Sequence, residues 1–419
     1  MLSNSACVAA ATLISAPMAL AGGADAMYIS LPDLGEVRKL DLTTGQLVPW
    51  ATGIFIPFYG KWGRDDFFYI QDAGLGAIWR VAADGKKHLV TAGGFINKPL
   101  SVTVHPTTGM LYVTDSYYQH IVIVDPSTGE QTVFVSNVGG RFNIPGGLAF
   151  DRDGNLFMTD HGTNDIMKID PAGNVTEFLD GPSNGIYVPA GIEIDGAGNI
   201  FVASYENNNI LRIRHDTAEW EVFCADPILQ EPNDIEIDTD GTLLVSSAES
   251  ASVVKIDALG HATLLHQDPS VGEWIGVSIR RTDLGMRGTM SDYGAGTAGD
   301  GGFVPRLGGI FSPNRAGEVA YVVDRATGGQ PGLMLWGLGA ASYPSWGGHI
   351  LVDFTSFWSL FHFTLAGNGA GQGSVRFRVV HPDDPVFDGA EFFMQAFVLD
   401  PANPFGIAMS QGLDIAFGQ

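Results

Sequence analysis

Three carboxylates occupy related positions in neighbouring parts of the sequence. Glu193 stands in GIEID, Glu236 occupies the same slot in DIEID, and Asp234 lies two residues before Glu236. Carboxylates that converge from adjacent strands can hold a divalent cation such as Ca²⁺ or Mg²⁺, or raise one another's pKa. The alternative is that the glutamates face solvent or pair with a nearby arginine. We therefore treat Glu193, Asp234 and Glu236 as candidate metal ligands, provided that the fold brings their strands to one channel.

A second set of residues combines aromatic rings with imidazole and amide groups in the segments between predicted strands. Rings supply stacking area, and a few polar groups fix the orientation of a polar organic ligand. Ordinary packing at strand ends and solvated loop tips are the alternative interpretation. The candidate binding residues are Tyr59, Tyr117, Tyr118, His161, Tyr205, Asn233 and Trp274.

Familiar catalytic motifs are absent from the sequence, which has no G-x-S-x-G, HExxH or CxxC. Gly294–Gly299 matches G-x-G-x-x-G, but no helical pattern follows it, so a dinucleotide site is not expected. Cys224 lies in a predicted strand, where a small buried side chain is the simpler interpretation. No catalytic residue is assigned on these grounds.

The stretch AFDRDGN, from Ala149 to Asn155, raises the question of a calcium loop. An EF-hand loop needs glycine at its sixth position, whereas the glycine of DRDGN is fourth. The same slot reads DGAGN, DTDGT and HPTTG elsewhere in the chain. A recurring hairpin turn that needs a residue tolerant of positive φ explains this pattern better than a calcium site.

The turn belongs to an internal repeat. Segments that begin at Lys98, Ile144, Val188 and Glu231 align, and their prolines Pro99, Pro145, Pro189 and Pro232 are 46, 44 and 43 residues apart. A weaker copy begins at Ile56. Each copy contains four short β-rich runs, for example 192–195, 199–203, 210–213 and 220–224. A repeat of this length with four strands predicts the blades of a β-propeller.

The two ends of the repeated region complement each other. The segment 272–280 resembles a first strand without a following blade, and 27–51 resembles the second to fourth strands without a first. Pairing them would complete one blade and remove the exposed edges of an open sheet. We therefore predict an all-β protein with a six-bladed propeller closed by its terminal strands, and we expect the loops before first strands and after second strands to ring the channel mouth.

The copies resemble NHL repeats, with the pattern P-x-G-[IL]-x-[IVF]-D-x-x-G-N-[LI]-[FY]-V-[TA]-[DS] followed by N-x-I-x-[KR]-[IV]-D. The resemblance covers roughly 27–280 and is strong from Ile144 to Asp257. It implies a propeller related to gluconolactonase-type lactonases, virginiamycin B lyase and peptide-amidating lyases. Asn233 in PND is similar to the Pro-Asn-Gly metal site of the lactonases. However, the segment Pro57–Gly60, in the first complete copy, lacks the Glu-Gly-Pro motif of that family. His161 has no second histidine to complete a lyase pattern.

Composition limits the partners. The 419-residue chain has a formal net charge of −24, which disfavours nucleic acid and anionic membranes. Its first residues, 1–26, have the shape of a secretory signal without a basic start, so a secreted, periplasmic or cell-surface location is expected, with no other segment apolar enough to cross a bilayer. Cys7 would leave with that signal, and Cys224 alone cannot form an intramolecular disulfide.

The C-terminal third shows a different pattern. We predict a propeller over 27–281, a Gly-rich linker over 282–302 and a β-sandwich over 303–419, because β-rich runs alternate there with turn residues. Its end resembles a C-terminal module of secreted planctomycete-type proteins. The residues that fill that pattern are Phe393, Gln395, Asp400, Pro401, Gly406, Ser410 and Leu413.

Together these features favour a secreted or cell-surface protein that binds a polar small molecule, a glycan or an extracellular protein on the propeller's loop face. One alternative is a metal-dependent lactonase or lyase at the channel mouth. Another is a structural component of an envelope or matrix. Fold alone does not choose among them.

Overall fold

The computed structural model describes residues 26–419 except 43, 64, 138, 239–241, 281–288, 311–317, 354, 356–357, 381–386, 388 and 418–419. Its regular elements are strands and four short 3-10 helices, so the all-β expectation is confirmed. Apart from Ala26, the expected signal segment lies outside the described residues. Over the described part of the chain, no helix is long and apolar enough to span a membrane.

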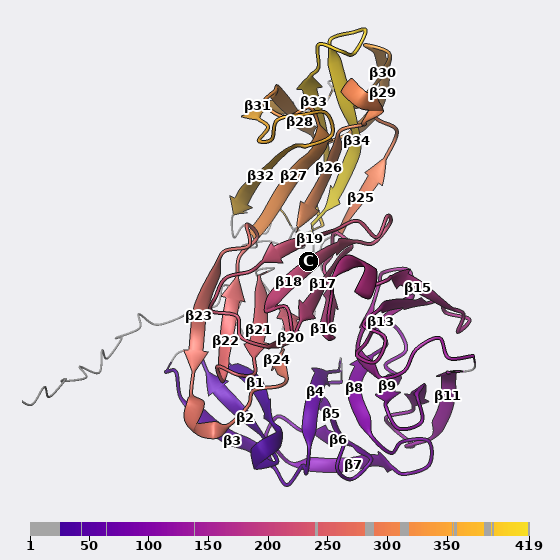
Figure 1. The fold of residues 1–419 in the computed structure, drawn as a ribbon, viewed down its shortest axis with the longest axis vertical. Coiled ribbons are helices and arrows are strands. Elements are labelled where there is room, and N and C mark those ends of the chain that lie inside the picture. The colour runs from indigo at the N-terminus through magenta and orange to yellow at the C-terminus, as the bar shows by residue number, and fades with distance from the viewer. Residues whose placement is uncertain are drawn as a thin grey trace, which may run out of the picture.

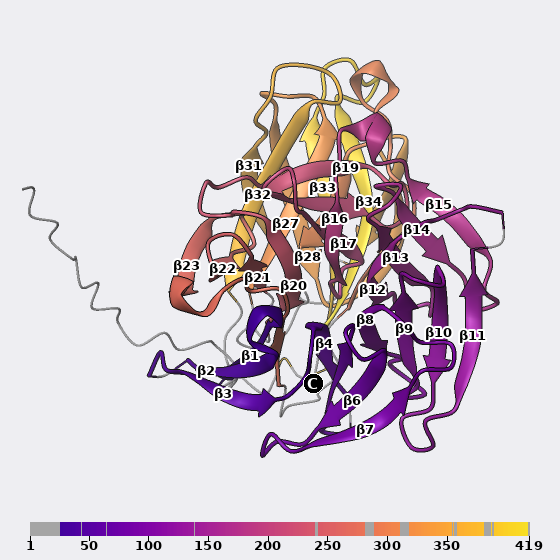
Figure 2. The ribbon, with the colours of Figure 1, turned by 60° about the horizontal axis from the view of Figure 1, so that its bottom comes forward.

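Four-strand antiparallel units follow one another along the chain and surround a common centre (Figures 1 and 2). In each unit the first strand lies innermost. The strands are β4–β7 (Pro57–Trp62, Phe68–Asp72, Ala77–Val81, Lys87–Ala92), β8–β11 (Pro99–Val104, Leu111–Asp115, His120–Val124, Gln131–Ser136), β12–β15 (Pro145–Phe150, Leu156–Asp160, Ile166–Ile169, Val175–Leu179), β16–β19 (Pro189–Ile194, Asn199–Ser204, Asn209–Arg214, Trp220–Cys224) and β20–β23 (Pro232–Ile237, Leu243–Ser247, Ser252–Ile256, Ala262–Gln267).

A further unit joins the two ends of the repeated region. Its order is β24-β1-β2-β3, with β24 at Val277–Ile279, β1 at Ala26–Leu31, β2 at Glu36–Asp41 and β3 at Leu47–Thr52. Tyr28 pairs with Ser278 and Ile29 with Val277 in antiparallel register. The predicted pairing of the two termini is therefore confirmed.

The first strands contact one another in a closed cycle: β4 with β8, β8 with β12, β12 with β16, β16 with β20, β20 with β24, and β24 with β4. A single parallel bridge between Tyr59 and Ser101 joins the β4 and β8 units into one eight-stranded sheet. The inner strands of all these units therefore surround one common axis.

A buried hydroxyl on the second strand links each of several units to the next. Thr159 Oγ1 accepts a hydrogen bond from Gly147 N at 2.8 Å and donates to Ala190 O of the following unit at 2.6 Å. Thr114 and Ser246 make the same pair of bonds in their units. Because these groups are fully buried, each hydroxyl satisfies two backbone groups that water cannot reach.

A buried aspartate ends the second strand in three units and fixes the loops at that end. Asp115 accepts hydrogen bonds from the backbone N–H groups of Asn97 and Lys98 and from those of Tyr117 and Tyr118. Asp72 and Asp160 hold their loops in the same way. These carboxylates therefore hold together, within each of these units, the loop before the first strand and the loop after the second.

The DRDGN segment forms one of several equivalent hairpin turns. Asp151 Oδ1 accepts from the N–H groups of Asp153 and Asn155, and Asp151 Oδ2 accepts from Asn155 Nδ2. Asp195 with Asn199, and Asp170 with Asn174, repeat this arrangement. The observed turn agrees with the interpretation of this stretch as a repeated hairpin.

The C-terminal part contains a five-stranded sheet, β25-β34-β33-β28-β31, a three-stranded sheet, β26-β27-β32, and the hairpin β29-β30. The strands are β25 Thr289–Tyr293, β26 Arg306–Ile310, β27 Glu318–Ala326, β28 Pro331–Gly337, β29 Ala340–Ser345, β30 Gly348–Val352, β31 Trp358–Thr364, β32 Gly373–Val380, β33 Glu391–Leu399 and β34 Ile407–Ala416. Because β25 pairs with β34, the range 282–302 is not simply a linker: it contains a strand of the C-terminal sheet.

Several residues of the planctomycete-type sequence pattern make buried hydrogen bonds within the C-terminal part. Gln395 is fully buried, accepts a hydrogen bond from Leu351 N and donates to Ser410 O. Ser410 Oγ accepts from Ala396 N, and Asp400 accepts from Asp300 N and Thr327 Oγ1. Their buried polar contacts support a structural role for the pattern.

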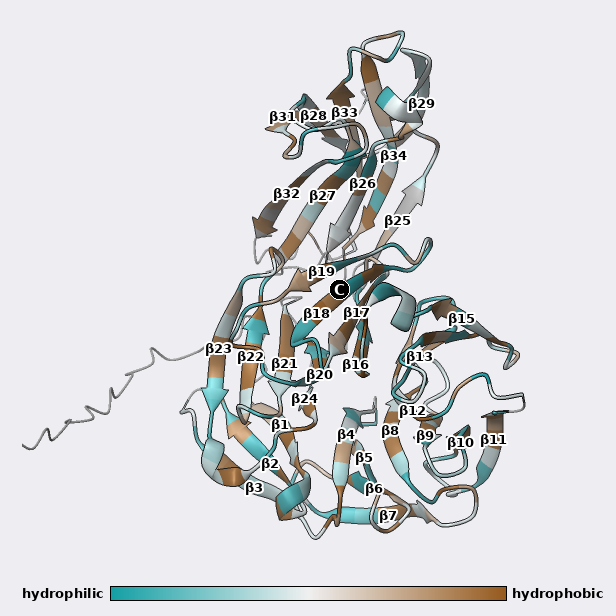
Figure 3. Cartoon of the chain, in the orientation of Figure 1, coloured by the Kyte–Doolittle hydropathy of each residue, from teal (hydrophilic) through white to brown (hydrophobic). Residues whose placement is uncertain are grey.

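The C-terminal part is docked on the repeated units, and apolar residues follow the strands of both (Figure 3). Ala320 and Val322 of β27 belong to the same buried cluster as Phe223 and Ile256. Around this contact Arg214 pairs with Asp324, Arg376 with Glu221, and Arg306 with Asp216 and Glu219. A shared core with a charged rim is typical of a fixed interface.

Candidate functional site

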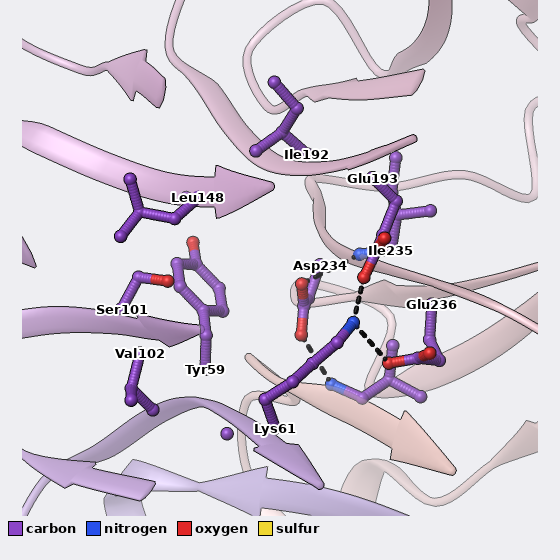
Figure 4. A pocket seen from close by; sticks show the side chains of 13 residues that line it. Tyr59, Lys61, Ser101, Val102, Leu148, Ile192, Glu193, Asp234, Ile235 and Glu236 are labelled. Atoms are coloured by element: carbon purple, nitrogen blue, oxygen red, sulfur yellow. Dashed lines mark hydrogen bonds and ion pairs between the residues drawn. The ribbon is translucent and has the colours of Figure 1, made fainter. Parts of the chain in front are cut away.

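The inner strands enclose a chamber on the common axis (Figure 4). The empty space among its lining residues amounts to about 330 Å³, part of which is open to solvent. The lining residues are Tyr59, Gly60, Lys61, Ser101, Val102, Gly147, Leu148, Ile192, Glu193, Asp234, Ile235, Glu236 and Val277.

Lys61 holds two of the predicted carboxylates together. Its ammonium pairs with Glu193 Oε1 and lies 2.9 Å from Glu236 Oε2, so three inner strands, β4, β16 and β20, meet in one ion cluster (Figure 4). The side chain of Lys61 is 28% exposed, that of Glu193 13% and that of Glu236 4%. The cluster is therefore enclosed by protein but still reached by water.

The carboxylates keep Lys61 charged. Burial alone would lower the pKa of Lys61, but the nearby Glu193 and Glu236 more than offset this and raise it above its usual value. An amine with a raised pKa is a poor nucleophile or base at neutral pH. Lys61 therefore acts as a resident cation, not as a Schiff-base lysine.

Asp234 lies beside this cluster, and its carboxyl group has a raised pKa. Burial raises the pKa of Asp234 to about 8, although the backbone N–H of Val277 and the charge of Lys61 oppose that rise. Asp234 Oδ2 accepts from Val277 N at 3.0 Å and Oδ1 from Ile235 N at 2.9 Å. Its carboxyl group is thus mostly protonated at neutral pH and ionises just above it.

Tyr59 forms the aromatic side of the chamber. Its hydroxyl donates to Asn233 Oδ1 at 2.5 Å, and its ring packs with Ala248, Ile275 and the partly buried Tyr205. Burial raises the pKa of Tyr59 well above its usual value, and the neighbouring Asp234 adds to this. Tyr59 is therefore a neutral hydrogen-bond donor with an apolar face.

The metal prediction for Glu193, Asp234 and Glu236 is not supported by this geometry. Lys61 already lies between the two glutamates, in the place where a shared cation would need to bind. Over the described residues, the group of acidic and histidine side chains whose ligand atoms lie within 4.8 Å of one another is Asp151, Asp153 and His215. The structure thus brings the three predicted carboxylates to one chamber, where Lys61 pairs with two of them.

Asp151, Asp153 and His215 form a possible metal-binding triad away from the chamber. Asp151 is already engaged by the turn, and its Oδ2 is 2.8 Å from His215 Nε2. Coordination would require Asp151 to exchange these hydrogen bonds for a metal ion. We therefore regard the triad as a stabilising contact of the repeated turn.

The predicted binding residues separate into several places. Tyr59, Asn233 and Tyr205 come together beside the chamber, with Tyr205 donating to Glu231 Oε2 at 2.6 Å. Tyr117 and Tyr118 are exposed and contact each other edge to face. Their positions agree with the expectation of a loop face, whereas the chamber lies deeper along the inner strands.

His161 and Trp274 depart from that expectation. His161 Nε2 is buried without a hydrogen-bond partner, close to Gly146, and burial lowers the pKa of His161 so that the ring is neutral. Trp274 is fully buried in an apolar cluster and stacks on His266. Trp274 is therefore a core residue and not a ligand-binding surface, contrary to the sequence prediction.

Sequence reasoning missed Lys61, although a signal for it exists. Lys61 follows Pro57 by four residues, just as Glu193 follows Pro189 and Glu236 follows Pro232. Equivalent positions on neighbouring inner strands face the same axis, so an alignment extended to the weak copy would have placed the lysine opposite the glutamates.

Comparisons with known proteins support the fold at a distance. No protein-family model matches the chain. It is similar to a chain of the nidogen–laminin complex, with 15% identity, a TM-score of 0.52 and coverage of 61% of this chain and 97% of that one. It is also similar to virginiamycin B lyase from Staphylococcus aureus, with 17% identity, a TM-score of 0.47 and coverage of 58% and 81%.

In sequence, the chain is 28% identical over 134 residues to strictosidine synthase-like protein 13 of Arabidopsis thaliana. That match covers 32% of this chain and spans only 29% of the relative's length. The comparisons therefore establish a nearly all-β protein with propeller-like structural neighbours. Its ligand has to be inferred from its own residues.

Proposed function

We propose that the units form a six-bladed propeller, that the C-terminal sheets form a β-sandwich fixed to it, and that the chain is secreted or displayed at the cell surface. The closed cycle of inner strands and the β1–β24 pairing support the ring. A left-handed residue also recurs after the second strand of each unit: Gly35, Gly76, Gln119, Asn164, Asn208 and Ala251. The proposal for the C-terminal part includes its resemblance to planctomycete-type modules.

The proposed function is binding of a small organic cation, such as an alkylguanidinium or alkylammonium, in the axial chamber. The observation that carries it is the cluster itself: the carboxylates of Glu193 and Glu236 meet around the ammonium of Lys61 among the inner strands, and Asp234 lines the same chamber. A charge enclosed by protein is costly unless it is paired. Ionised Asp234 places a negative charge in the chamber that a ligand cation can pair with.

A monovalent organic cation suits the chamber better than a metal ion. Lys61 already neutralises part of the cluster, and a divalent ion would have to displace or approach its ammonium at a Coulombic cost. Tyr59 offers a ring face, and Ile192 and Ile235 offer apolar contacts to the alkyl part of such a ligand. The lining thus combines negative charge with apolar surface.

Titration calorimetry with n-butylguanidinium, and with n-butylurea as its neutral match, tests this proposal. We expect the guanidinium to bind and the urea not to bind. The guanidinium should bind more tightly above about pH 8 than near pH 6, because ionised Asp234 attracts it. For each pH unit by which the bound ligand lowers the pKa of Asp234, the affinity at high pH should exceed the affinity at low pH by about tenfold. The Asp234→Asn variant should bind the guanidinium with an affinity that does not increase at high pH. Equal binding of both probes, or an unchanged pH profile in the variant, would contradict the proposal.

A second candidate is a lactonase or lyase that uses Asp234 as its acid–base group. The pKa of about 8 favours it, because such a group changes protonation near the pH at which proton transfer is useful. Hydrolysis of γ- and δ-lactones, followed by pH-stat, should then be lost in Asp234→Asn. Absence of both turnover and cation binding would leave the structural role in an envelope or matrix.

A further inference from the structure

A separate surface surrounds the end of the ring where the second strands finish and the first strands begin. In an antiparallel four-strand unit, the loop before strand one and the loop between strands two and three lie at the same end. We call the exposed apolar side chains of these loops the mouth surface. They are Leu34 (46% exposed), Phe55 (65%), Leu75 (58%), Phe95 (48%), Tyr117 (61%), Tyr118 (47%), Ile144 (37%) and Tyr187 (45%).

Neighbouring members of the mouth surface are held in place. The Phe55 ring lies against Gly74, where an added Cβ would meet Phe55 Cδ1 at 2.0 Å. Tyr118 contacts both Tyr117 and His120, and Phe95 contacts His120. Because Asp72 and Asp115 fix the backbone of these loops, the rings are presented on rigid supports.

The loops of adjacent units are also linked around this end. Gln119 Nε2 donates to Asn143 Oδ1, Val188 N donates to Asn164 Oδ1, and Glu231 N donates to Asn208 Oδ1. A pre-organised surface loses little conformational entropy when a partner binds. Exposed apolar side chains gathered on such a surface typically mark an interaction site.

The remaining part of the same end is acidic. Glu206, Glu249 and Glu273 are exposed in its loops, and Glu231 is half-buried. Burial raises the pKa of Tyr205, and the nearby Glu231, Glu273 and Glu249 raise it further, so these carboxylates gather around one ring. The mouth surface therefore borders a patch of negative charge.

We propose that the mouth surface docks a basic polypeptide segment of another protein, with apolar side chains on the rings and Lys or Arg side chains beside Glu231, Glu249 and Glu273. Charge selects this occupant: a net charge of −24 repels a second copy of the chain, nucleic acid and anionic lipid. Apolar rings with a charged border fit a polypeptide, because aromatic anchors and polar rims are typical of protein interfaces.

Short fluorescein-labelled peptides test the proposal on the full chain by fluorescence anisotropy. Alternating Leu-Lys peptides should bind, with affinity that falls as salt rises, whereas Leu-Glu and Ser-Lys peptides of equal length should bind at least about tenfold more weakly. Phe95→Ser with Tyr117→Ser, and separately Glu249→Gln with Glu273→Gln, should each reduce Leu-Lys binding about tenfold.

The matched control replaces two exposed apolar residues on outer strands, Val222→Ser with Leu264→Ser, which should leave peptide binding unchanged. An equal loss in this control, equal binding of Leu-Glu peptides, a dimer in sedimentation that the mouth variants abolish, or preferential binding to phosphatidylcholine vesicles would each overturn the proposal. Asp234→Asn should not affect peptide binding, so failure of the chamber and failure of the mouth surface are distinguishable.

Discussion

Lys61 and Glu236 meet across the axis of the ring, with Lys61 Nζ 2.9 Å from Glu236 Oε2, although 175 residues separate them in the chain. Glu193 completes the contact from a third strand. The strands that bring these groups together belong to different units. Both the ligand proposal and the stability of the centre depend on this contact.

Replacing Lys61 by Met should lower the free energy of unfolding by about 2–3 kcal/mol at neutral pH, because it leaves two enclosed glutamates without their cation. Urea unfolding measures the loss. A control that also carries Glu193→Gln should recover much of the stability; no recovery would mean that lysine packing, not charge, is what matters.

Asp234 should make the folded state less stable as pH rises. The raised pKa of Asp234 means that its carboxyl group keeps its proton in the folded state, but not in the unfolded state, between about pH 4 and pH 8. The contribution of Asp234 to stability is therefore fully present below about pH 4 and is lost as the pH rises to about 8. The slope is at most about 1.4 kcal/mol per pH unit. Asp234→Asn should flatten it in urea titrations; parallel profiles for the two proteins would refute this assignment.

The linking hydroxyl of Thr159 should contribute strongly to stability. Thr159→Val keeps the shape but leaves Gly147 N–H and Ala190 C=O without a buried partner, so a loss of about 2 kcal/mol is expected. Thr217→Val, at an exposed turn position, is the control. If both substitutions have the same effect on the unfolding midpoint, the bridging bonds are not the cause.

The contact between the two parts of the chain should depend on Val322. A carboxylate in Val322→Asp would be buried beside Phe223 and opposite Arg376, where it would disrupt the shared core and compete with Glu221 for Arg376, at a cost of roughly 3 kcal/mol. The C-terminal part should then separate from the repeated units, and small-angle scattering should show a larger radius of gyration. Val322→Ile should retain the compact form. A compact Val322→Asp protein would show that the charged rim alone holds the parts together.

The repeated units were predictable because their physical signals are local. The prolines, the turn residues and the β-rich runs recur at a nearly constant spacing, and predicted runs such as 199–203 and 220–224 correspond to β17 and β19. The pairing of 27–51 with 272–280 was predictable because the first segment lacks a first strand and the second segment supplies one. In the C-terminal part, β25 escaped prediction because its Gly-rich surroundings resemble a linker.

The site was only partly predictable, since side-chain partners depend on strands far apart in sequence. Glu193 and Glu236 were placed correctly on neighbouring strands, but their cation lies in the weakest copy of the repeat. Trp274 was misplaced because its position relative to the core depends on how β24 joins β1. Tyr117 and Tyr118 lie in a loop that Asp115 anchors, and their side chains are exposed.

The pairing of β1 with β24 also sets a condition on biosynthesis. Strand β1, at Met27–Ile29, receives its inner partner only after Val277–Ile279 has been synthesised. Until then the growing chain carries an unsatisfied sheet edge that can pair with other molecules. Chains terminated before Val277 should therefore aggregate rather than accumulate as shorter soluble forms, and only the completed repeat region should be resistant to proteolysis.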